Sequence, residues 1–185
     1  MHIIGIFLSY FSAMKQYDVI VIGGGLAGLT VAIHLSNHKI SVLVIERHKY
    51  PRHKVCGEYV SNEVKPYLNY LGVDLKKLSL PQINELKITI PKGNEINQNL
   101  DLGGFGISRY AFDKLLYEKA KSLGADFVFE KAEDVFEDGK IYEVKTRNKN
   151  YTGNLVIGSF GKRSNIDQKF QRDFTKKPAH WVGIK

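Results

Sequence analysis

Short apolar runs alternate with polar, glycine-bearing stretches along most of the chain, and two early runs have the form of buried strands. Val19–Ile22 and Ser41–Ile45 are almost wholly apolar and rich in β-branched residues, as strands of a parallel sheet covered on both faces are. The segment from about Leu26 to Leu35 between them predicts an amphipathic helix. This order of strand, helix and strand predicts a βαβ unit in a Rossmann-like α/β fold with a parallel sheet.

In the middle of the chain, apolar residues first recur at every second position, as in a strand, and then at helical spacing. Glu85–Pro91 alternates polar and apolar residues, and Glu95–Leu102 is a weaker partner, so we expect an inserted antiparallel sheet at about residues 83–105. Ser108 then predicts the cap of a helix that runs to Leu123, with Gly124 just past its end.

The second half predicts further strands. Asp126–Phe129 would be the third parallel strand, and Val135–Ser159 would hold two or three strands of an antiparallel meander with a hairpin turn at Asp138-Gly139. Leu155–Ile157 reads as another buried run, which ends at a second glycine-bearing exit from a strand.

Three glycines after the first strand indicate a binding site as well as a fold. Gly23, Gly25 and Gly28 have G-x-G-x-x-G spacing: the first suits a tight turn, the second a close approach of pyrophosphate, and the third close packing of helix on strand. The helix that starts at Leu26 and Ala27 would direct its first amides and its positive dipole end at the phosphates. The motif therefore predicts a dinucleotide site that needs no cationic side chain.

An acid at the end of the second strand strengthens this prediction. Glu46 lies 18 positions after Gly28, the spacing of the carboxylate that accepts hydrogen bonds from a ribose 2′-hydroxyl. The carboxylate would repel a 2′-phosphate, and Arg47 would offset this only in part, so NADP is disfavoured in this pocket. A structural βαβ unit with an incidental acid is the alternative.

Composition narrows the class of protein without naming a function. The chain has 185 residues, 43% hydrophobic and 25% charged, as one soluble globular domain would. Its formal charge of +8 is scattered rather than gathered in a basic stripe, so we expect no nucleic-acid partner. Cys56 is the single cysteine, and the six histidines show no metal-ligand spacing, so we expect no disulfide, no metal and a cytoplasmic protein.

The ends of the chain carry separate expectations. Residues 1–13 are apolar but too short to span a bilayer and have no basic residue before them, so we expect an extension outside the fold and no stable membrane insertion. A membrane-contacting segment is the minority alternative. Residues 14–167 would form the nucleotide-binding domain, and residues 168–185 would be the start of a further region.

Four segments of the chain have the form of known motifs: GGGLAGL with Glu46-Arg47; Pro51 to Glu58, similar to P-x-x-K-x-C-G; Gly106 to Arg109 with Phe112, Asp113 and Leu116; and Val156 to Ser164, similar to A-D-G-x-x-S. Together they resemble flavoprotein oxidoreductases of the p-hydroxybenzoate hydroxylase and geranylgeranyl reductase type, including flavin-dependent halogenases. The second and third segments are narrower signatures than the first.

The resemblance implies FAD as the cofactor. It implies cofactor contacts from the glycine turn, from Glu46 and Arg47, and from a second set of residues near the flavin: Lys54, Cys56, Gly57, Arg109 and Gly161. Cys56 is equally readable as an inert buried thiol. The chain departs from the family pattern at Phe160, where the family has Asp, so a polar contact from that carboxylate is lost.

For function, the resemblance implies an FAD-dependent monooxygenase or a double-bond reductase, with an unknown small-molecule substrate and NAD(P)H as a possible electron donor. The family's substrate-covering part lies further along the chain than residue 185, so we expect an N-terminal portion with an incomplete active site and no assigned catalytic residue. A nucleotide-binding module without redox chemistry is the alternative.

Overall fold

The computed structural model describes residues 15–56, 58–76, 78–91, 93–161 and 164–176. In this part the chain forms two compact units, residues 15–49 with 117–176 and residues 50–116. The division falls within helix α4 (Arg109–Ser122). The expectations for residues 1–13, for Gly57 and for the last nine residues lie outside the described residues.

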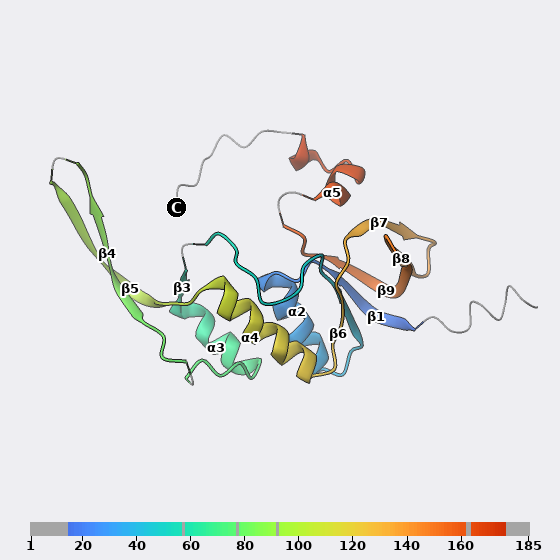
Figure 1. Cartoon of the computed structure of the whole chain (residues 1–185), viewed down its shortest axis with the longest axis horizontal. Helices are drawn as coiled ribbons and strands as arrows, with labels where there is room; N and C mark the ends of the chain where they lie inside the picture. The colour runs from blue at the N-terminus through green and yellow to red at the C-terminus, as the bar shows by residue number, and fades with distance from the viewer. Residues whose placement is uncertain (1–14, 57, 77, 92, 162–163, 177–185) are drawn as a thin grey trace, which may run out of the picture. The chain divides into compact units, whose positions relative to one another are not determined.

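The first unit is built on one six-stranded sheet (Figure 1). Its spatial order is β6-β2-β1-β9-β8-β7, in which the first four strands run parallel and the last two pair antiparallel. The strands are β1 (Gln16–Ile22), β2 (Val42–Ile45), β6 (Asp126–Val128), β7 (Ala132–Glu137), β8 (Tyr142–Thr146) and β9 (Asn150–Gly158). The predicted α/β fold with a parallel sheet and an antiparallel meander is confirmed.

The centre of this sheet is the core of the unit. Every residue of β2 is buried, and β1 is buried from Val19 onward. Helix α2 (Leu26–Asn37) buries Leu29, Ala32 and Ile33. Because β1 and β2 are parallel neighbours, the glycine turn after β1 and the acid after β2 come to the same edge of the sheet.

One expected burial is wrong. Leu155–Ile157 does not form a buried run: Leu155 is 48% exposed, and the two residues after it are half-buried. The reason lies in the strand pairing. β8 accompanies β9 only as far as Gly153, so within the described residues the second half of β9 pairs on one side, with β1.

The second unit is a separate antiparallel arrangement. Its three-stranded sheet has the order β3-β5-β4, with β3 (Tyr59–Ser61), β4 (Gln82–Thr89) and β5 (Glu95–Gly106), and the pair β4 and β5 forms an extended hairpin (Figure 1). A turn of 3-10 helix, η1 (Asn62–Val64), leads into helix α3 (Lys65–Tyr70). The sequence did not indicate β3, because three residues are too few to show a period.

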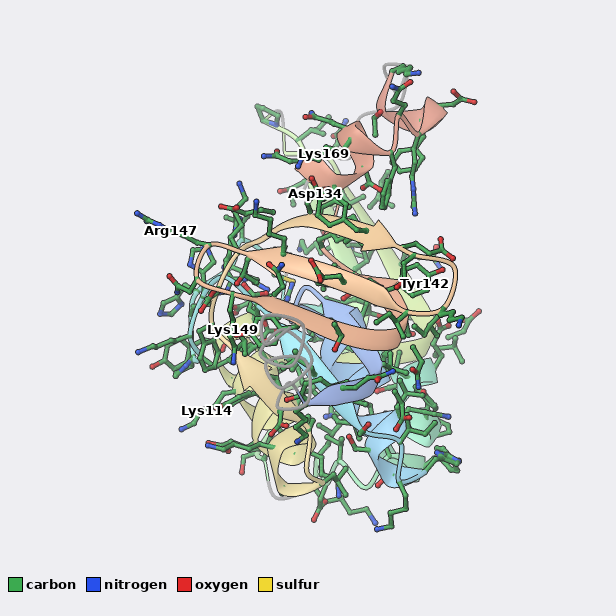
Figure 2. The ribbon with its side chains drawn as sticks, turned by 90° about the vertical axis from the view of Figure 1, so that its right-hand side faces the viewer. Lys114, Asp134, Tyr142, Arg147, Lys149 and Lys169 are labelled. Atoms are coloured by element: carbon green, nitrogen blue, oxygen red, sulfur yellow. The ribbon has the colours of Figure 1, made fainter. Side chains whose placement is uncertain are left out.

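Helix α4 begins where its cap predicts, since the Ser108 hydroxyl accepts a hydrogen bond from the Ala111 amide at 3.2 Å. It ends before Gly124, whose φ is +93°. In the first unit, a short helix, α5 (Asn165–Lys169), follows β9 and precedes the 3-10 turn η2 (Asp173–Thr175). Figure 2 shows Lys169 of α5 beside Asp134 of β7, and the two form an ion pair at 2.5 Å.

Candidate functional site

The glycine turn after β1 has the geometry that its sequence predicts. Gly23 has a φ of +102°, which an L side chain rarely adopts, and its amide donates to the Ile45 carbonyl at 2.8 Å. Gly25 is the residue before α2 and has no side chain to cap it, and the first turn carries no acid. The first amides of α2, at Leu26 and Ala27, therefore have no partner within the helix and are suited to an anion.

Gly28 brings the helix, the turn and the neighbouring strand together. A Cβ on Gly28 would overlap the Gly23 carbonyl oxygen and lie 2.5 Å from the Ser159 hydroxyl. A Cβ on Gly23 would lie 2.5 Å from the Ser159 carbonyl oxygen. Both glycines are therefore required by the close approach of three backbone segments.

The carboxylate of Glu46 lies against this turn. Glu46 is 6% exposed, and one of its carboxylate oxygens accepts a hydrogen bond from the Gly24 amide at 2.9 Å. The other accepts from the His48 amide at 3.1 Å. The carboxylate therefore lies at the edge of the sheet that carries the glycine turn, and carboxylate oxygens are the acceptors that a ribose hydroxyl requires. Arg47 next to it is exposed.

The exit of β9 closes the turn from the other side. The Ser159 amide donates to the Ile22 carbonyl at 2.8 Å, and the Ser159 hydroxyl lies 2.6 Å from the Gly23 carbonyl oxygen. Sequence reasoning did not single out Ser159 as a site residue. Its signal was a hydroxyl directly after a glycine-ended strand, but the contact depends on the pairing of β9 with β1.

Phe160 and Gly161 follow Ser159, and Phe160 stands where the A-D-G-x-x-S pattern has its acid. The Phe160 side chain packs against the core and covers Gly158. Gly161 has a φ of +78° and open space where a Cβ would be, so the backbone turn persists although the carboxylate does not. Ser164 caps α5, since its hydroxyl accepts from the Ile166 amide at 3.1 Å.

In the second unit, two of the predicted site residues meet at a buried acid. Asp113 is fully buried, and Arg109 binds it through two contacts, Nε to Oδ1 at 2.7 Å and a terminal nitrogen to Oδ2 at 3.0 Å. The Lys54 ammonium lies 3.2 Å from the same Oδ2. Burial lowers the pKa of Lys54 below its ordinary value, Asp113 opposes this shift, and repulsion by Arg52 and Arg109 adds to it.

The other predicted residue of this loop has a different setting. Cys56 is half-buried, so it is not an interior thiol, and Val55 before it is 99% exposed. Sequence reasoning quoted Asp113 only within a motif and did not select it, although its spacing of four from Arg109 is that of a helical ion pair.

Two further features of the described residues bear on the site. Among these residues no group of three or more His, Cys, Asp or Glu side chains is placed to hold a metal ion. No helix that the structure describes is long and apolar enough to cross a membrane.

A cleft of about 390 Å³ lies in the first unit between the end of α4 and β6, lined by Tyr117, Lys121, Phe127 and Phe129 among others. Most of its lining lies where β6 begins, so it does not coincide with the glycine turn, which follows the end of β1.

Comparisons with known proteins agree with this geometry. A family model described as FAD binding domain matches residues 16–185. The digeranylgeranylglycerophospholipid reductase of Thermoplasma volcanium is 29% identical, in a match that covers 93% of this chain and 43% of the reductase.

Solved structures show the same fold. The p-nitrophenol 4-monooxygenase PnpA from Pseudomonas putida matches with a TM-score of 0.75 at 16% identity, over 85% of this chain and 44% of that one. The flavin-dependent brominase Bmp2 matches with a TM-score of 0.65 at 24% identity, over 80% and 39%. The chain thus spans less than half the length of each of these proteins.

Proposed function

Because the chain belongs to the FAD binding domain family, we propose that its glycine turn holds the ADP half of FAD for an oxidoreductase of the monooxygenase or double-bond reductase class. FAD as the cofactor and the resemblance to flavoprotein hydroxylases, reductases and halogenases agree with the family and with the relatives. The activity itself is proposed for a protein that contains this chain, since the chain spans 43% of the reductase that it resembles.

The observation that carries the proposal is the contact of Glu46 with the Gly24 amide at 2.9 Å. Through this contact the carboxylate after β2 lies directly beside the turn after β1, and this supports a single site that uses both. The uncapped start of α2 would receive the pyrophosphate through backbone amides, and Glu46 would accept hydrogen bonds from the adenosine ribose. A 2′-phosphate would meet a buried carboxylate, so we expect FAD or NAD to bind here in preference to NADP.

The flavin ring supplies the redox chemistry when FAD is bound, and the protein contributes position and electrostatics. In the first unit these contributions come from the amides of Leu26 and Ala27, the carboxylate of Glu46, and the hydroxyl of Ser159, which holds the turn in place. Cofactor contacts by Arg47, Lys54, Cys56 and Arg109 stay predictions. A small-molecule substrate, NAD(P)H as electron donor and a cytoplasmic location are also part of the proposal.

A non-catalytic nucleotide-binding module is the second candidate function. Phe160 favours it, because its side chain packs on the core where the family pattern has an acid. The two functions predict different ligands for the same turn.

The test is to purify residues 14–185 and titrate them with FAD, ADP, NAD and NADP, following flavin absorbance and fluorescence and, for the other ligands, heat of binding. We expect a yellow protein that binds FAD and ADP, and binds NADP more weakly than NAD. Reduction of the bound flavin by NADPH, with uptake of oxygen, would support the oxidoreductase function. Binding of ADP and NAD without FAD would favour the module, and no binding of any of the four would refute both.

A further inference from the structure

The cleft between the end of α4 and β6 has a wall of aromatic rings, at the place where Figure 1 shows the helix end beside the strand. The rings of Tyr117 and Phe127 meet edge to face, with centroids 4.7 Å apart and planes at 79°. Phe129 is tilted by 60° against Tyr117 and lies nearly parallel to Phe127, with centroids 6.5 Å apart. All three side chains are half-buried, so the wall keeps part of its apolar surface exposed to solvent.

The cleft has the size and the access that a small ligand requires. Its volume of about 390 Å³ lies within the range of small-molecule sites, which is roughly 300–1,000 Å³. β6 is the edge strand of the six-stranded sheet, so no further strand of the described chain lies beyond it. At Gly124, which also lines the cleft, no atom lies within 4 Å of the place where a Cβ would stand. The lining is therefore open on the side of Gly124.

The two charged residues of the lining, Asp126 and Lys121, are in different electrostatic settings. The Asp126 carboxylate is paired with the Lys15 ammonium at 2.5 Å and accepts a hydrogen bond from the Tyr17 hydroxyl at 2.9 Å. Lys121 is exposed, and its ammonium lies 6.0 Å from the centroid of the Tyr117 ring. The negative charge of the lining is thus already neutralised by an ion pair, whereas a cation stands over the aromatic wall. This arrangement favours an anionic ligand over a cationic one.

We infer that this cleft is a second binding site, for a flat aromatic ring that carries a carboxylate. The three aromatic side chains contact the ring, because aromatic pairs gain from stacked and edge-to-face contacts beyond the burial of apolar area. Lys121 receives the carboxylate at the exposed side of the wall. The inference goes beyond the proposed function and does not depend on it, since the cleft lies where β6 begins and the glycine turn follows the end of β1.

The test measures the binding of 2-naphthoate to the chain of 185 residues by titration calorimetry. Two reference compounds separate the parts of the ligand: 2-naphthylmethanol has the ring without the charge, and cyclohexanecarboxylate has the charge without a flat ring. We expect one naphthoate to bind per chain, more tightly than either reference compound. Absence of saturable binding would overturn the inference, and so would binding of cyclohexanecarboxylate with equal affinity.

The aromatic wall is tested by Tyr117→Leu, which keeps an apolar side chain and removes the ring. We expect naphthoate to bind roughly two- to tenfold more weakly, the scale of one aromatic contact. Tyr142→Leu is the matched control, because Tyr142 is a half-buried tyrosine of the same unit that does not line the cleft. Equal affinity of Tyr117→Leu and Tyr142→Leu for naphthoate would show that the ligand is bound elsewhere.

Lys121→Gln tests the charge at an exposed position, where the substitution leaves the packing of the unit unchanged. We expect about two- to fivefold weaker binding of naphthoate, the scale of an exposed ion pair, and unchanged binding of 2-naphthylmethanol. A loss of fold would weaken both compounds, so this difference identifies a direct contact with the carboxylate. Lys140→Gln, at another exposed position of the same unit, should alter neither affinity. Unchanged naphthoate binding in Lys121→Gln would refute the role of Lys121.

A last titration separates the cleft from the glycine turn. The affinity for naphthoate is measured again with FAD present in excess, and we expect the same dissociation constant, because the two sites lie at different ends of the parallel strands. Displacement of naphthoate by FAD would mean that the compound occupies the nucleotide site, and the inference of a second site would then be wrong.

Discussion

At the scale of single residues, the proposed dinucleotide site depends both on the missing Cβ atoms of its glycines and on the carboxylate of Glu46. Gly28 has no Cβ, and for that reason α2 approaches β1 and β9 closely enough for Ser159 to reach the turn. Glu46 supplies the opposite kind of constraint, because a buried carboxylate must be satisfied and finds its partners in two backbone amides. Both residues therefore shape the turn before any ligand binds.

The substitution Gly28→Ala tests the first constraint. The new methyl group would overlap the Gly23 carbonyl oxygen, so we expect a loss of about 1–3 kcal/mol in the free energy of unfolding. FAD affinity should fall together with stability, because the turn itself has to move. Urea unfolding and flavin titration measure the two effects.

Gly139→Ala is the matched control. Gly139 also lies in the first unit, with a φ of +84° and open space for a Cβ, so the substitution adds backbone strain of about 1–2 kcal/mol without a clash. It should lower stability and leave FAD affinity unchanged. Equal loss of FAD affinity in both variants would mean that the close approach at Gly28 has no particular importance for the ligand.

The substitution Glu46→Gln tests the second constraint. An amide has one acceptor oxygen, so its NH2 group would face the amide of Gly24 or His48, and the negative charge near the ribose would be lost. We expect FAD binding to weaken by about 1.5–3 kcal/mol, the range for hydrogen bonds to charged groups. Discrimination between NAD and NADP should also decrease. Glu133→Gln, at an exposed position of β7, should change neither quantity.

At the scale of elements, β9 links the meander to the proposed nucleotide site at the glycine turn. Its first residues pair with β8, its last ones pair with β1, and Ser159 follows directly after it. The position of Ser159 is therefore fixed by the pairing of β9 with β1, which the Ser159 amide continues through its hydrogen bond to the Ile22 carbonyl. This gives the hydroxyl a defined place beside Gly23.

Ser159→Ala measures what this contact contributes. The variant keeps the backbone hydrogen bond to Ile22 but loses the hydroxyl contact with the Gly23 carbonyl, so we expect about 0.5–1.5 kcal/mol less stability and a few-fold weaker FAD binding. Ser122→Ala, which removes an exposed hydroxyl at the end of α4, is the control. Equal stability of Ser159→Ala and the unmutated chain would show that the backbone pairing alone holds the turn.

The elements differ in how well the sequence predicted them. The βαβ unit was predictable because its information is local: a β-branched run, three glycines at fixed spacing and an acid at the end of the next strand. The burial of Leu155–Ile157 was not, since an apolar run does not reveal whether a further strand lies beside it. Asp113 and Ser159 were missed for a related reason, because their partners are distant in sequence or become neighbours only on a helix face.

At the scale of the whole molecule, most ion pairs among the described residues join exposed or half-buried side chains, whereas two carboxylates in ion pairs, Asp113 and Asp167, are buried. Several carboxyl groups of the first unit have a pKa below the ordinary value, mainly through hydrogen bonds: from Lys15 to Asp126, and from Lys169 to Asp134. These groups are partly or largely exposed, so each contributes little alone. Together they make the protein less stable as the pH falls.

We expect acid to destabilise the protein. A carboxyl group whose pKa is lower in the folded state stabilises the fold above its unfolded value, which is 3.8 for Asp, and loses that contribution as pH falls through the folded pKa. The urea concentration at which half of the protein is unfolded should therefore be constant above about pH 5 and should decrease as the pH is lowered below about 4. The substitution Asp134→Asn should make this fall less steep, whereas Asp101→Asn should not. A midpoint that rises on acidification would contradict the assignment.

The division of β9 between two partners has a consequence for how this protein tolerates insertions and deletions. Residues added to the turn between β8 and β9 lengthen a loop and leave the register of β9 on β1 unchanged. One residue added inside the stretch paired with β1 would shift everything after it by about 3.3 Å and reverse which side chains face inward. We therefore expect the tips of the meander to accept insertions, whereas a change in the number of residues from Thr152 to Ser159 should displace Ser159 from the glycine turn.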